Sequence, residues 1–534
     1  MKKNIIAIIT LALLIGSVGC KKDYLALEPK TSQMEANYYK TESDALFALA
    51  AVYQAMAVHN GLEFVPITSD VRSDDAFCGG SSASDMVQWH QIENGLQTAE
   101  SSTAQKQWSR CYSGIYRANL LLSKLDQINW TTPGLKARFE AETKFCRAYF
   151  YWDLVRQFGW VPIFTTNLSS VDDYKSAKQS TPEEVYKQIA SDLLVAANGL
   201  PGTVAVSEKG RATRYAAKAL MARIYLFYQG FAKPVLGITN EWTNGTTTID
   251  KALVQASLDS VIINGGYQLL PNYADVFSWT NQNNAESIFE LQYSEKGKCG
   301  NWGADYWDVY GNMAVIMYGI RDPKGDNTVS TGWSFATLSW SLVNEFETGD
   351  TRKAATVYDA SVSLTDYTRG YQNTGYFNKK FLPLKAYDAT VGSRELNYGK
   401  NYIDIRLPDV LLMASELYLT DNTAKSLDYF NRVRTRAMGN GAAKTSITID
   451  DIYHERRVEF GGEGLRYWDL LRRGLDFTDQ KIQASINVPN GIPNPTDFQD
   501  IKFNKNTYGM YPIPATEIRS TNSGDLKQYI PAFQ

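Results

Sequence analysis

Two polar stretches of the chain combine aromatic rings with side chains that form strong hydrogen bonds, one at residues 70–91 and one at residues 301–310. Flat aromatic faces pack on the C–H faces of pyranose rings, while amide and charged groups bind sugar hydroxyls. Both stretches therefore have the composition of a sugar-binding surface, although each ring has the alternative role of a plain core residue. The residues that we predict to contact such a ligand are Asp74, Asp75, Trp89, His90, Asn301, Trp302, Tyr306, Trp307 and Trp333.

The sequence offers little support for catalysis. The three histidines, His59, His90 and His454, lie far apart, and His454-Glu455 lacks the second histidine of an HExxH zinc motif. No G-x-S-x-G elbow or Walker phosphate loop occurs. A glycoside hydrolase needs two carboxylates that flank one bond, and 57 acidic residues prevent such a pair from being identified. We therefore predict a binding protein that is not an enzyme, with a surface hydrolase as the less favoured alternative.

The cysteines lack the spacing of a metal site. Cys78, Cys111, Cys146 and Cys299 are scattered along the chain, and four thiols allow three pairings. Cys146 lies within an apolar helical pattern, so we expect it to be a buried free thiol. A structural calcium ion stays open, but no EF-hand-type loop supports one. The sequence thus predicts no disulfide framework, no metal site and no cofactor.

The first twenty residues have the pattern of a lipoprotein signal peptide. Lys2 and Lys3 precede an apolar run over residues 5–19, and small residues lead directly to Cys20. The run is shorter than the roughly twenty apolar residues that span a membrane. We expect residues 1–19 to be removed and Cys20 to carry acyl chains such as palmitate, which anchor a protein to a membrane. An ordinary secretory signal that contains a cysteine is the alternative.

The composition is that of a globular protein rather than a disordered or nucleic-acid-binding one. Hydrophobic residues make up 44% of the chain. The formal charge of −3 becomes about −5 without Lys2 and Lys3, and no basic block occurs, which argues against nucleic acid as a partner. Aromatic residues reach 13%, with 33 tyrosines and 12 tryptophans. Many of these rings must be core, yet the content also suits a sugar-binding protein.

Helical periodicity dominates the segments that must position the two polar stretches. Apolar residues recur at three- and four-residue steps from Ala45 to Met56, with Ser43 as the expected N-cap. Thr181 followed by Pro182 and two glutamates is a strong helix start. Antiparallel helix pairs of a tetratricopeptide-like kind fit this pattern, although no strict 34-residue repeat is present. Further helices are predicted at about 116–125, 142–158, 213–228, 250–263, 408–419, 427–437, 452–460 and 465–473.

The sequence pattern changes from helical to irregular between about residues 268 and 400. Short strand-like pieces such as 287–291 alternate there with Gly, Asn, Ser and Thr. Long irregular segments are uncommon unless they bind something. We therefore divide residues 20–534, a single unit, into a helical part (20–267), a loop-rich ligand-facing part (268–400) and C-terminal helices with a surface wrap (401–534).

Ordered sequence blocks along the mature chain form a family pattern. They are Tyr24-Leu25 with Pro29, Ala141–Tyr151 running on to Phe158–Pro162, Arg211–Thr213, Glu286–Glu290, Asp350–Arg352, Arg406–Leu412, Glu455–Phe460 with Glu463–Arg466, and Pro512–Pro514. In this order they resemble the SusD/RagB family of nutrient-binding lipoproteins from Bacteroidetes. The departures are small: Ser415 stands where the family has alanine, and the ending LKQYIPAF matches the family only loosely.

The most specific block, at residues 455–469, has a structural interpretation. Its charged side chains can pair with one another and tie two helices together, while Gly461-Gly462 permits the turn between them. Charged groups held between elements demand such partners, and no catalysis is needed to explain them. The predicted ion-pair network comprises Arg456, Arg457, Glu459, Glu463, Arg466 and Asp469.

The resemblance implies a mostly α fold, in which tetratricopeptide-like helix pairs form a scaffold for a loop-rich region with a few short strands. It also implies a lipid-anchored protein of the outer membrane that faces the cell exterior. Such a protein captures oligosaccharide or polysaccharide on a loop surface and passes it to a SusC-like TonB-dependent barrel. Capture of peptides, as in the RagB branch, is the alternative. The Trp and Tyr residues at 302–310 favour sugar, because a peptide groove must also satisfy backbone groups.

Overall fold

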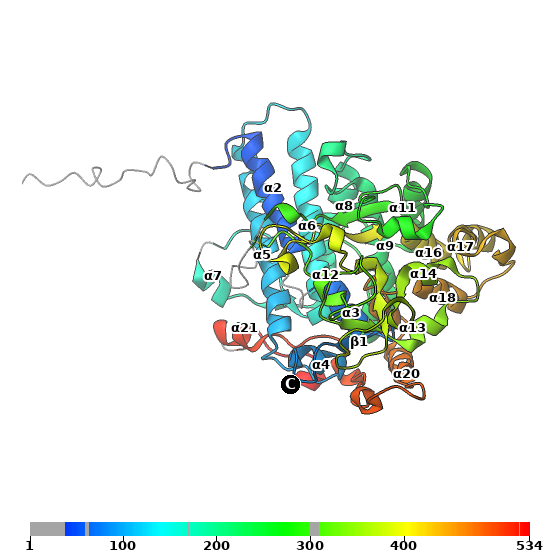
Figure 1. The fold of residues 1–534 in the computed structure, drawn as a ribbon. Helices are drawn as coiled ribbons and strands as arrows, with labels where there is room; N and C mark the ends of the chain where they lie inside the picture. Colours follow the sequence, from blue (N-terminus) through cyan, green and yellow to red (C-terminus); the bar gives the residue numbers. More distant parts are fainter. Residues whose placement is uncertain (1–37, 59–63, 169, 298, 300–308, 523) are drawn as a thin grey trace, which may run out of the picture.

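The computed structural model describes residues 38–58, 64–168, 170–297, 299, 309–522 and 524–534. A series of long helices runs through it, and each helix packs against the next one in the series (Figure 1). This arrangement of successive helix pairs confirms the predicted mostly α fold. The series is α2 (Glu42–Ala57), α5 (Ser102–Lys124), α6 (Leu135–Phe158), α8 (Pro182–Gly199), α9 (Arg214–Phe227), α11 (Lys251–Asn264), α16 (Leu407–Tyr418) and α17 (Thr423–Met438).

Side-chain caps set where several of these helices begin. Thr181 caps α8 in a capping box with Glu184, as the sequence predicts. The predicted cap Ser43 is wrong by two positions, because Thr41 caps α2 and Asp44 completes the capping box. Gly159 ends α6 with a φ of 72°, a backbone conformation that glycine adopts without a steric penalty.

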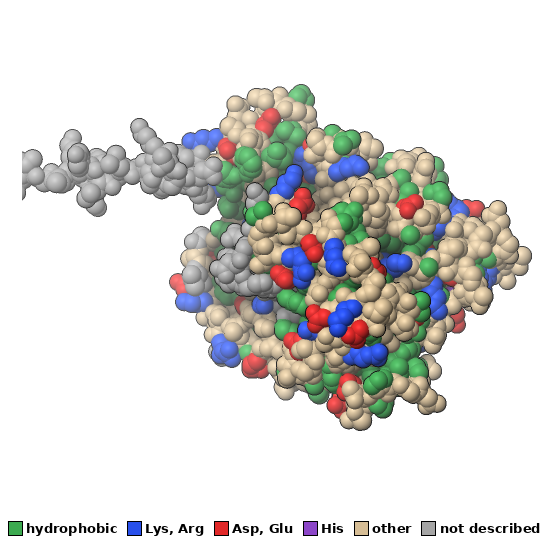
Figure 2. Space-filling model, in the orientation of Figure 1, with side chains coloured by type: hydrophobic (Ala, Val, Ile, Leu, Met, Phe, Trp, Pro, Cys, Tyr) green, Lys and Arg blue, Asp and Glu red, His purple; other side chains and the backbone are tan. Residues whose placement is uncertain are grey.

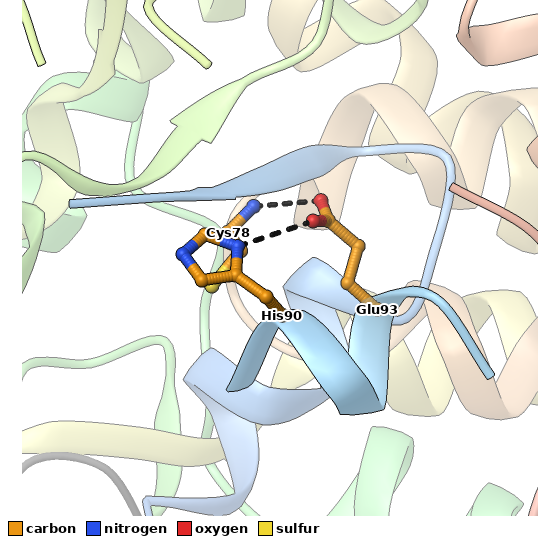
Figure 3. Close-up of side chains that lie close together, drawn as sticks. All are labelled: Cys78, His90 and Glu93. Carbon is orange, nitrogen blue, oxygen red and sulfur yellow. Dashed lines mark hydrogen bonds and ion pairs between the residues drawn. The ribbon is translucent and has the colours of Figure 1, made fainter. Parts of the chain in front are cut away.

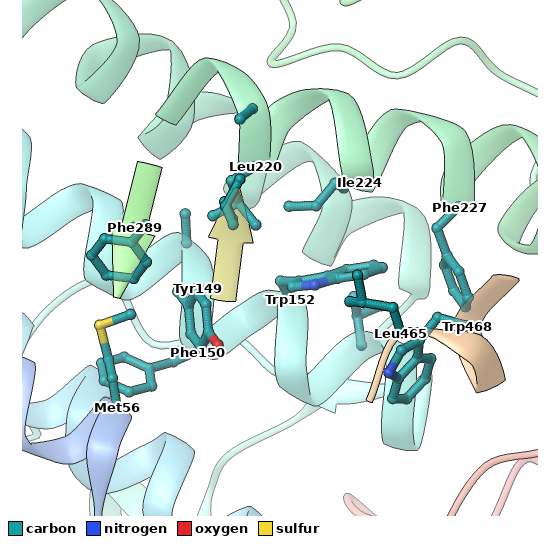
Figure 4. Packing of buried hydrophobic residues seen from close by; sticks show 14 of the residues in the cluster. Met56, Tyr149, Phe150, Trp152, Leu220, Ile224, Phe227, Phe289, Leu465 and Trp468 are labelled. Atoms are coloured by element: carbon teal, nitrogen blue, oxygen red, sulfur yellow. The ribbon is translucent and has the colours of Figure 1, made fainter. Parts of the chain in front are cut away.

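Helix α6 lies at the centre of the protein. Every residue from Phe145 to Phe158 is buried, which is the pattern of a helix surrounded on all sides. Its apolar side chains contact α9 and the strand that contains Phe289, and Trp152 packs edge-to-face on Phe227 (Figure 4). Its buried charges are paired, since Arg147 binds Asp192 on α8. The largest core therefore forms around this helix.

Short antiparallel strands connect parts of the chain that are far apart in sequence. The described residues contain four two-stranded sheets. The predicted strand at residues 287–291 is confirmed as β4. The pairs are β1 (Ala76–Gly79) with β5 (Phe335–Leu338), β2 (Val161–Pro162) with β3 (Gln179–Ser180), β4 (Ser287–Leu291) with β8 (Tyr402–Arg406), and β6 (Val357–Asp359) with β7 (Tyr376–Asn378).

Shorter helices fill the rest of the structure. Near β1 and β5 lie α3 (Val65–Val71), α4 (Val87–Glu93) and α12 (Ala314–Tyr318). The others are α7 (Val171–Lys175), α10 (Lys233–Leu236), α13 (Trp340–Glu345), α14 (Thr351–Thr356), α15 (Ala360–Ser363), α18 (Ile449–Phe460), α19 (Arg466–Arg472), α20 (Leu475–Ser485) and α21 (Ala515–Ser520). Among the described helices, none combines the length and the hydropathy that a membrane span requires.

The C-terminal segment is more deeply embedded than a surface wrap. Met510, Tyr511 and Ile513 are buried, and the Tyr511 amide donates to the carbonyl of Gln157 at the end of α6. The last forty residues therefore help to close the main core. Cys146 is a buried free thiol, as predicted.

Candidate functional site

The charged block at residues 455–469 forms a buried ion-pair network. Arg456 donates from Nε to Asp469 across 2.8 Å and so joins α18 to α19, as predicted. Most of the other partners come from distant segments. Glu463 accepts from Arg406 at 2.9 Å and from Lys380 at 2.7 Å. The prediction that these side chains are paired is confirmed, but the network links several parts of the fold instead of two helices alone.

Asp74 and Asp75 belong to this network. Arg466 forms a bidentate pair with Asp74, at 2.7 and 2.9 Å, and Arg457 donates to Asp75 at 2.9 Å. Both aspartates are at most 1% exposed. The prediction that they contact a surface ligand is therefore corrected, because a buried carboxylate held by arginine has no free face for a sugar.

Burial and the arginines act in opposite directions on the two carboxyls. Burial favours the neutral form of Asp74, but the guanidinium groups of Arg457 and Arg466 outweigh it and hold its pKa well below the usual range. Burial raises the pKa of Asp75 to about 6, with the neighbouring Asp74 charge adding to the rise and Arg457 opposing it. Asp74 and Asp75 therefore stabilise the fold through their arginine partners.

Trp89 and His90 are also buried, on the short helix α4. The Trp89 ring packs edge-to-face on Phe335 of β5, with centroids 5.2 Å apart. His90 packs against Tyr371 in the same way, at 5.0 Å. Trp89 is 0% exposed and His90 is 7% exposed. Their predicted role as ligand contacts is corrected, since both rings are part of the core beneath the surface.

The second predicted stretch is only partly described. Asn301, Trp302, Tyr306 and Trp307 lie outside the described residues, so their role stays a prediction. Directly after them, Val309 is buried and Tyr310 is 49% exposed.

Among the predicted contacts that the structure describes, Trp333 is the one that is not fully buried, and its half-buried ring packs on the main core. A hydrogen bond holds its backbone in place, because the Trp333 amide donates to the carbonyl of Ile316 at 2.9 Å. Gly332 makes a close backbone approach to Gly319, so that a Cβ atom on Gly332 would lie 2.2 Å from the Cα atom of Gly319. Because neither glycine has a side chain, the two backbone segments can pack this closely, and the contact fixes the position of the Trp333 backbone.

An ion pair between loop 80–86 and Arg321 was not predicted from the sequence. Asp85 accepts from the backbone amide of Ser81 at 2.8 Å and from Nη2 of Arg321 at 3.2 Å. Ser334 connects this pair to the tryptophan, because its side chain accepts from the Arg321 amide and its carbonyl accepts from Gly80. The side chains of Asp85 and Arg321 are 26% and 22% exposed. We call loop 80–86, Arg321 and Trp333 together the shelf.

A separate groove lies between α2 and β4. It has a volume of about 540 Å³ and is lined mainly by apolar side chains of both elements, together with Val309 and Tyr310. Phe47 at its rim is 63% exposed. Figure 2 shows hydrophobic side chains gathered over α2, whereas charges of both signs are mixed over the middle of the same face. The shelf, with its ion pair and aromatic ring, suits a polar sugar better than this groove does.

Comparison with known proteins identifies the family. Residues 23–226 match a SusD-like family model described as starch-binding and associating with the outer membrane, and residues 353–532 match the SusD family model. A SusD-like protein of Bacteroides ovatus is 29% identical over 88% of this chain and 82% of its own.

Solved structures agree with this assignment. A laminarin-binding SusD-like protein is 31% identical, with a TM-score of 0.76 over 91% of this chain and 100% of its own. Surface glycan-binding protein A from Bacteroides thetaiotaomicron, in complex with laminarihexaose, is 26% identical, with a TM-score of 0.76 over 92% of this chain and 99% of its own. The chain therefore belongs to the SusD/RagB family.

Proposed function

We propose that this protein captures a glycan at the bacterial surface, and that a laminarin-type β-glucan is the first ligand to test. The observation that carries the proposal is the similarity, over nearly the whole chain, to a laminarin-binding SusD-like protein. The local chemistry agrees with it. An aromatic ring can stack on a sugar, and the ion pair that Ser334 links to the Trp333 segment has hydrogen-bond donors and acceptors for hydroxyls.

Within this proposal the shelf forms part of the binding surface. Trp333 supplies the stacking ring, and the exposed parts of Asp85 and Arg321 bind hydroxyl groups at its edge. Asn301, Trp302, Tyr306 and Trp307 complete the predicted contact set. The affinity comes from stacking and a few hydrogen bonds, so the surface acts without covalent chemistry.

We also propose where the protein is located and which partner receives the glycan. Acyl chains on Cys20 anchor the protein in the outer membrane, facing outward. A SusC-like TonB-dependent barrel receives the glycan from it. These statements rest on family membership and on the leader sequence.

The binding test uses the mature chain without Cys20 in affinity gels and in calorimetry. Laminarin is compared with starch and with a peptide library, and Trp333→Ala is compared with wild type. Trp130→Ala is the matched control, because Trp130 is also half-buried but packs near the N-terminal ends of α2 and α6. The proposal predicts retardation by laminarin that is lost in Trp333→Ala and kept in Trp130→Ala.

Two of the other outcomes favour a different function, and the third changes the location of the binding surface. Binding to peptides with no response to any polysaccharide would support the RagB-like alternative. Release of short oligosaccharides from laminarin by the purified protein would support a surface hydrolase. Equal loss in Trp333→Ala and Trp130→Ala would remove the shelf from the binding surface.

A further inference from the structure

Beneath the shelf, three side chains of metal-binding type meet in the protein interior (Figure 3). Cys78 comes from β1, whereas His90 and Glu93 lie one turn apart on α4. One ligand atom from each lies within 4.8 Å of the other two. All three residues are buried, at 0%, 7% and 4% exposure. The group thus sits where β1 and α4, the elements that flank loop 80–86, come together.

The imidazole of His90 is not satisfied by the other members of the cluster. Within the described part of the chain, neither ring nitrogen of His90 has a hydrogen-bond partner. The distance from His90 Nδ1 to Glu93 Oε2 is 3.8 Å, too long for a hydrogen bond. A buried imidazole normally binds a partner through at least one nitrogen, because leaving both unmade costs free energy. The position therefore has an unused ligand that is more than nine-tenths buried.

The buried carboxylate of Glu93 also lacks a partner of opposite charge among the lysines and arginines of the described residues. It accepts from the Cys78 amide at 2.8 Å and from the Gln372 side chain at 2.7 Å. Those neutral donors do not supply the positive charge that a buried carboxylate requires. A cation between Glu93, His90 and Cys78 would supply it.

The surrounding residues hold the cluster in place. Gln372 donates to Glu93 and accepts from the Gly79 amide at 2.9 Å, so it bridges β1 and α4. It does so from a backbone φ of 47°, which is costly for a residue other than glycine. An orienting hydrogen bond on a carboxylate ligand is a regular feature of protein metal sites.

We propose that Cys78, His90 and Glu93 bind a divalent transition-metal ion, with Zn²⁺ as the best match to a thiolate, imidazole and carboxylate set. Zn²⁺ takes these donors at about 2.3, 2.0 and 2.1 Å, so the three ligand atoms must move closer together on binding. Binding converts the Cys78 thiol to a thiolate and releases its proton to solvent. The charges then balance, because thiolate and carboxylate together neutralise the ion.

The ion would have a structural effect on the shelf. It ties β1 to α4 and thereby fixes both ends of loop 80–86, which carries Asp85. A divalent cation would hold the Cys78 sulfur as a thiolate, since a metal-bound thiol is deprotonated. The site thus differs from the glycan-binding surface and does not depend on it.

The test measures metal directly. The mature chain without Cys20, purified without a histidine tag and stripped with a chelator, is titrated with Zn²⁺ and separately with Co²⁺. The proposal predicts one ion per chain and, with Co²⁺, a thiolate-to-metal charge-transfer band. Cys78→Ser should lose that band, and His90→Gln should weaken binding by at least about tenfold. Cys111→Ser is the matched control, a buried cysteine of α5, and should keep both signals.

Two further measurements keep the outcome decisive. Gln372→Leu leaves all three ligands in place but removes the orienting hydrogen bond, and should weaken Zn²⁺ binding by about tenfold. Near-ultraviolet circular dichroism checks that each variant is folded. The proposal is overturned if folded wild-type protein binds no stoichiometric Zn²⁺, or if the Co²⁺ band is the same in wild type, Cys78→Ser and His90→Gln. Laminarin binding is scored separately, so either proposal can fail alone.

Discussion

Arg457 donates from Nε to the Oδ1 atom of Asp75 across 2.9 Å, although 382 positions separate the two residues in the chain. The same guanidinium lies 3.1 Å from the carboxylate of Asp74. Arg457 and Arg466, both from the most family-specific block, therefore neutralise a stretch of the chain that resembles a ligand-binding loop in sequence. The Arg457 contact favours arginine over lysine at this position, since lysine cannot span both carboxylates with a planar fork.

Replacement of Arg457 by methionine should destabilise the protein strongly. The change leaves Asp74 and Asp75 buried with one fewer guanidinium, and removal of one partner of a buried pair costs about 3–5 kcal/mol. The measurement is the midpoint and slope of denaturation in urea. Lys324→Met is the control, because Lys324 pairs with Asp366 on the surface, with both side chains more than 60% exposed, and should leave the midpoint unchanged. Equal midpoints for both variants would contradict the prediction.

Asp70 should make stability depend on pH. It is 1% exposed and accepts hydrogen bonds from the Gly464 amide and the Tyr318 hydroxyl, both at 2.8 Å. Burial raises its pKa to about 8, and the Asp75 charge adds to the rise. The protonated form is favoured in the folded state, so the associated stability is fully present below the unfolded pKa of about 3.9 and is lost as pH rises to about 8.

Asp70→Asn tests that pH dependence. The amide can accept from Gly464 and donate to Tyr318, so the geometry is retained without the titration. Over pH 5–8 the free energy of unfolding of wild type should fall relative to the variant by up to about 1.4 kcal/mol per pH unit, the slope for one proton. Asp366→Asn, at an exposed position, should follow wild type. Parallel pH curves for wild type and Asp70→Asn would rule out this role.

Gly332→Ala should disturb the shelf without changing any polar group. The added Cβ would lie 2.2 Å from Gly319, so one of the two backbone segments must shift. Overpacking of this kind costs about 1–3 kcal/mol and would also displace Trp333. Unfolding in urea and laminarin calorimetry should both respond. Gly441→Ala is the matched control, because Gly441 has open space around its Cβ position, and it should leave both measurements at wild-type values.

Asp85→Asn should weaken glycan binding more than it weakens the fold. The substitution removes the charge that holds Arg321 at 3.2 Å but keeps an oxygen for Ser81. Hydrogen bonds to charged groups contribute about 1.5–3 kcal/mol, so a loss of about tenfold or more in laminarin affinity is expected. Asp366→Asn again serves as the control. An unchanged affinity would show that the ion pair lies outside the ligand contacts.

Local features of the fold followed from the sequence, because their causes are local. The capping box at Thr181 and the end of α6 at Phe158, which Gly159 follows, depend on neighbours within a few residues. The failed N-cap at Ser43 shows the limit, since Thr41 prevails through a reciprocal bond with Asp44 that a serine two positions later cannot form.

The candidate site was harder to predict, because its determinants are distant in sequence. The sequence indicates only a polar loop residue at Asp74. The fold shows that Arg466 lies beside it. Trp89 has the composition of a ligand contact but points into the core against Phe335. Asp85 and Arg321 are separated by 236 positions, so their pairing gives no local signal. Residue type predicted the chemistry of the surface, and only tertiary contacts show which of its members reach solvent.

The pairing of Asp74 with Arg466 also constrains how the chain folds. The two residues are 392 positions apart, and the pairing of β1 with β5, in which Ala76 lies opposite Leu338, also joins distant segments. Contacts of such high sequence separation form slowly, because a long loop must close before they stabilise anything. Until residues 457–466 are available, the two aspartates near the start of the chain have no guanidinium to neutralise them and stay in water. We therefore expect this part of the fold to form only after residues 457–466 are synthesised, and a chain truncated before residue 457 to be more sensitive to proteases.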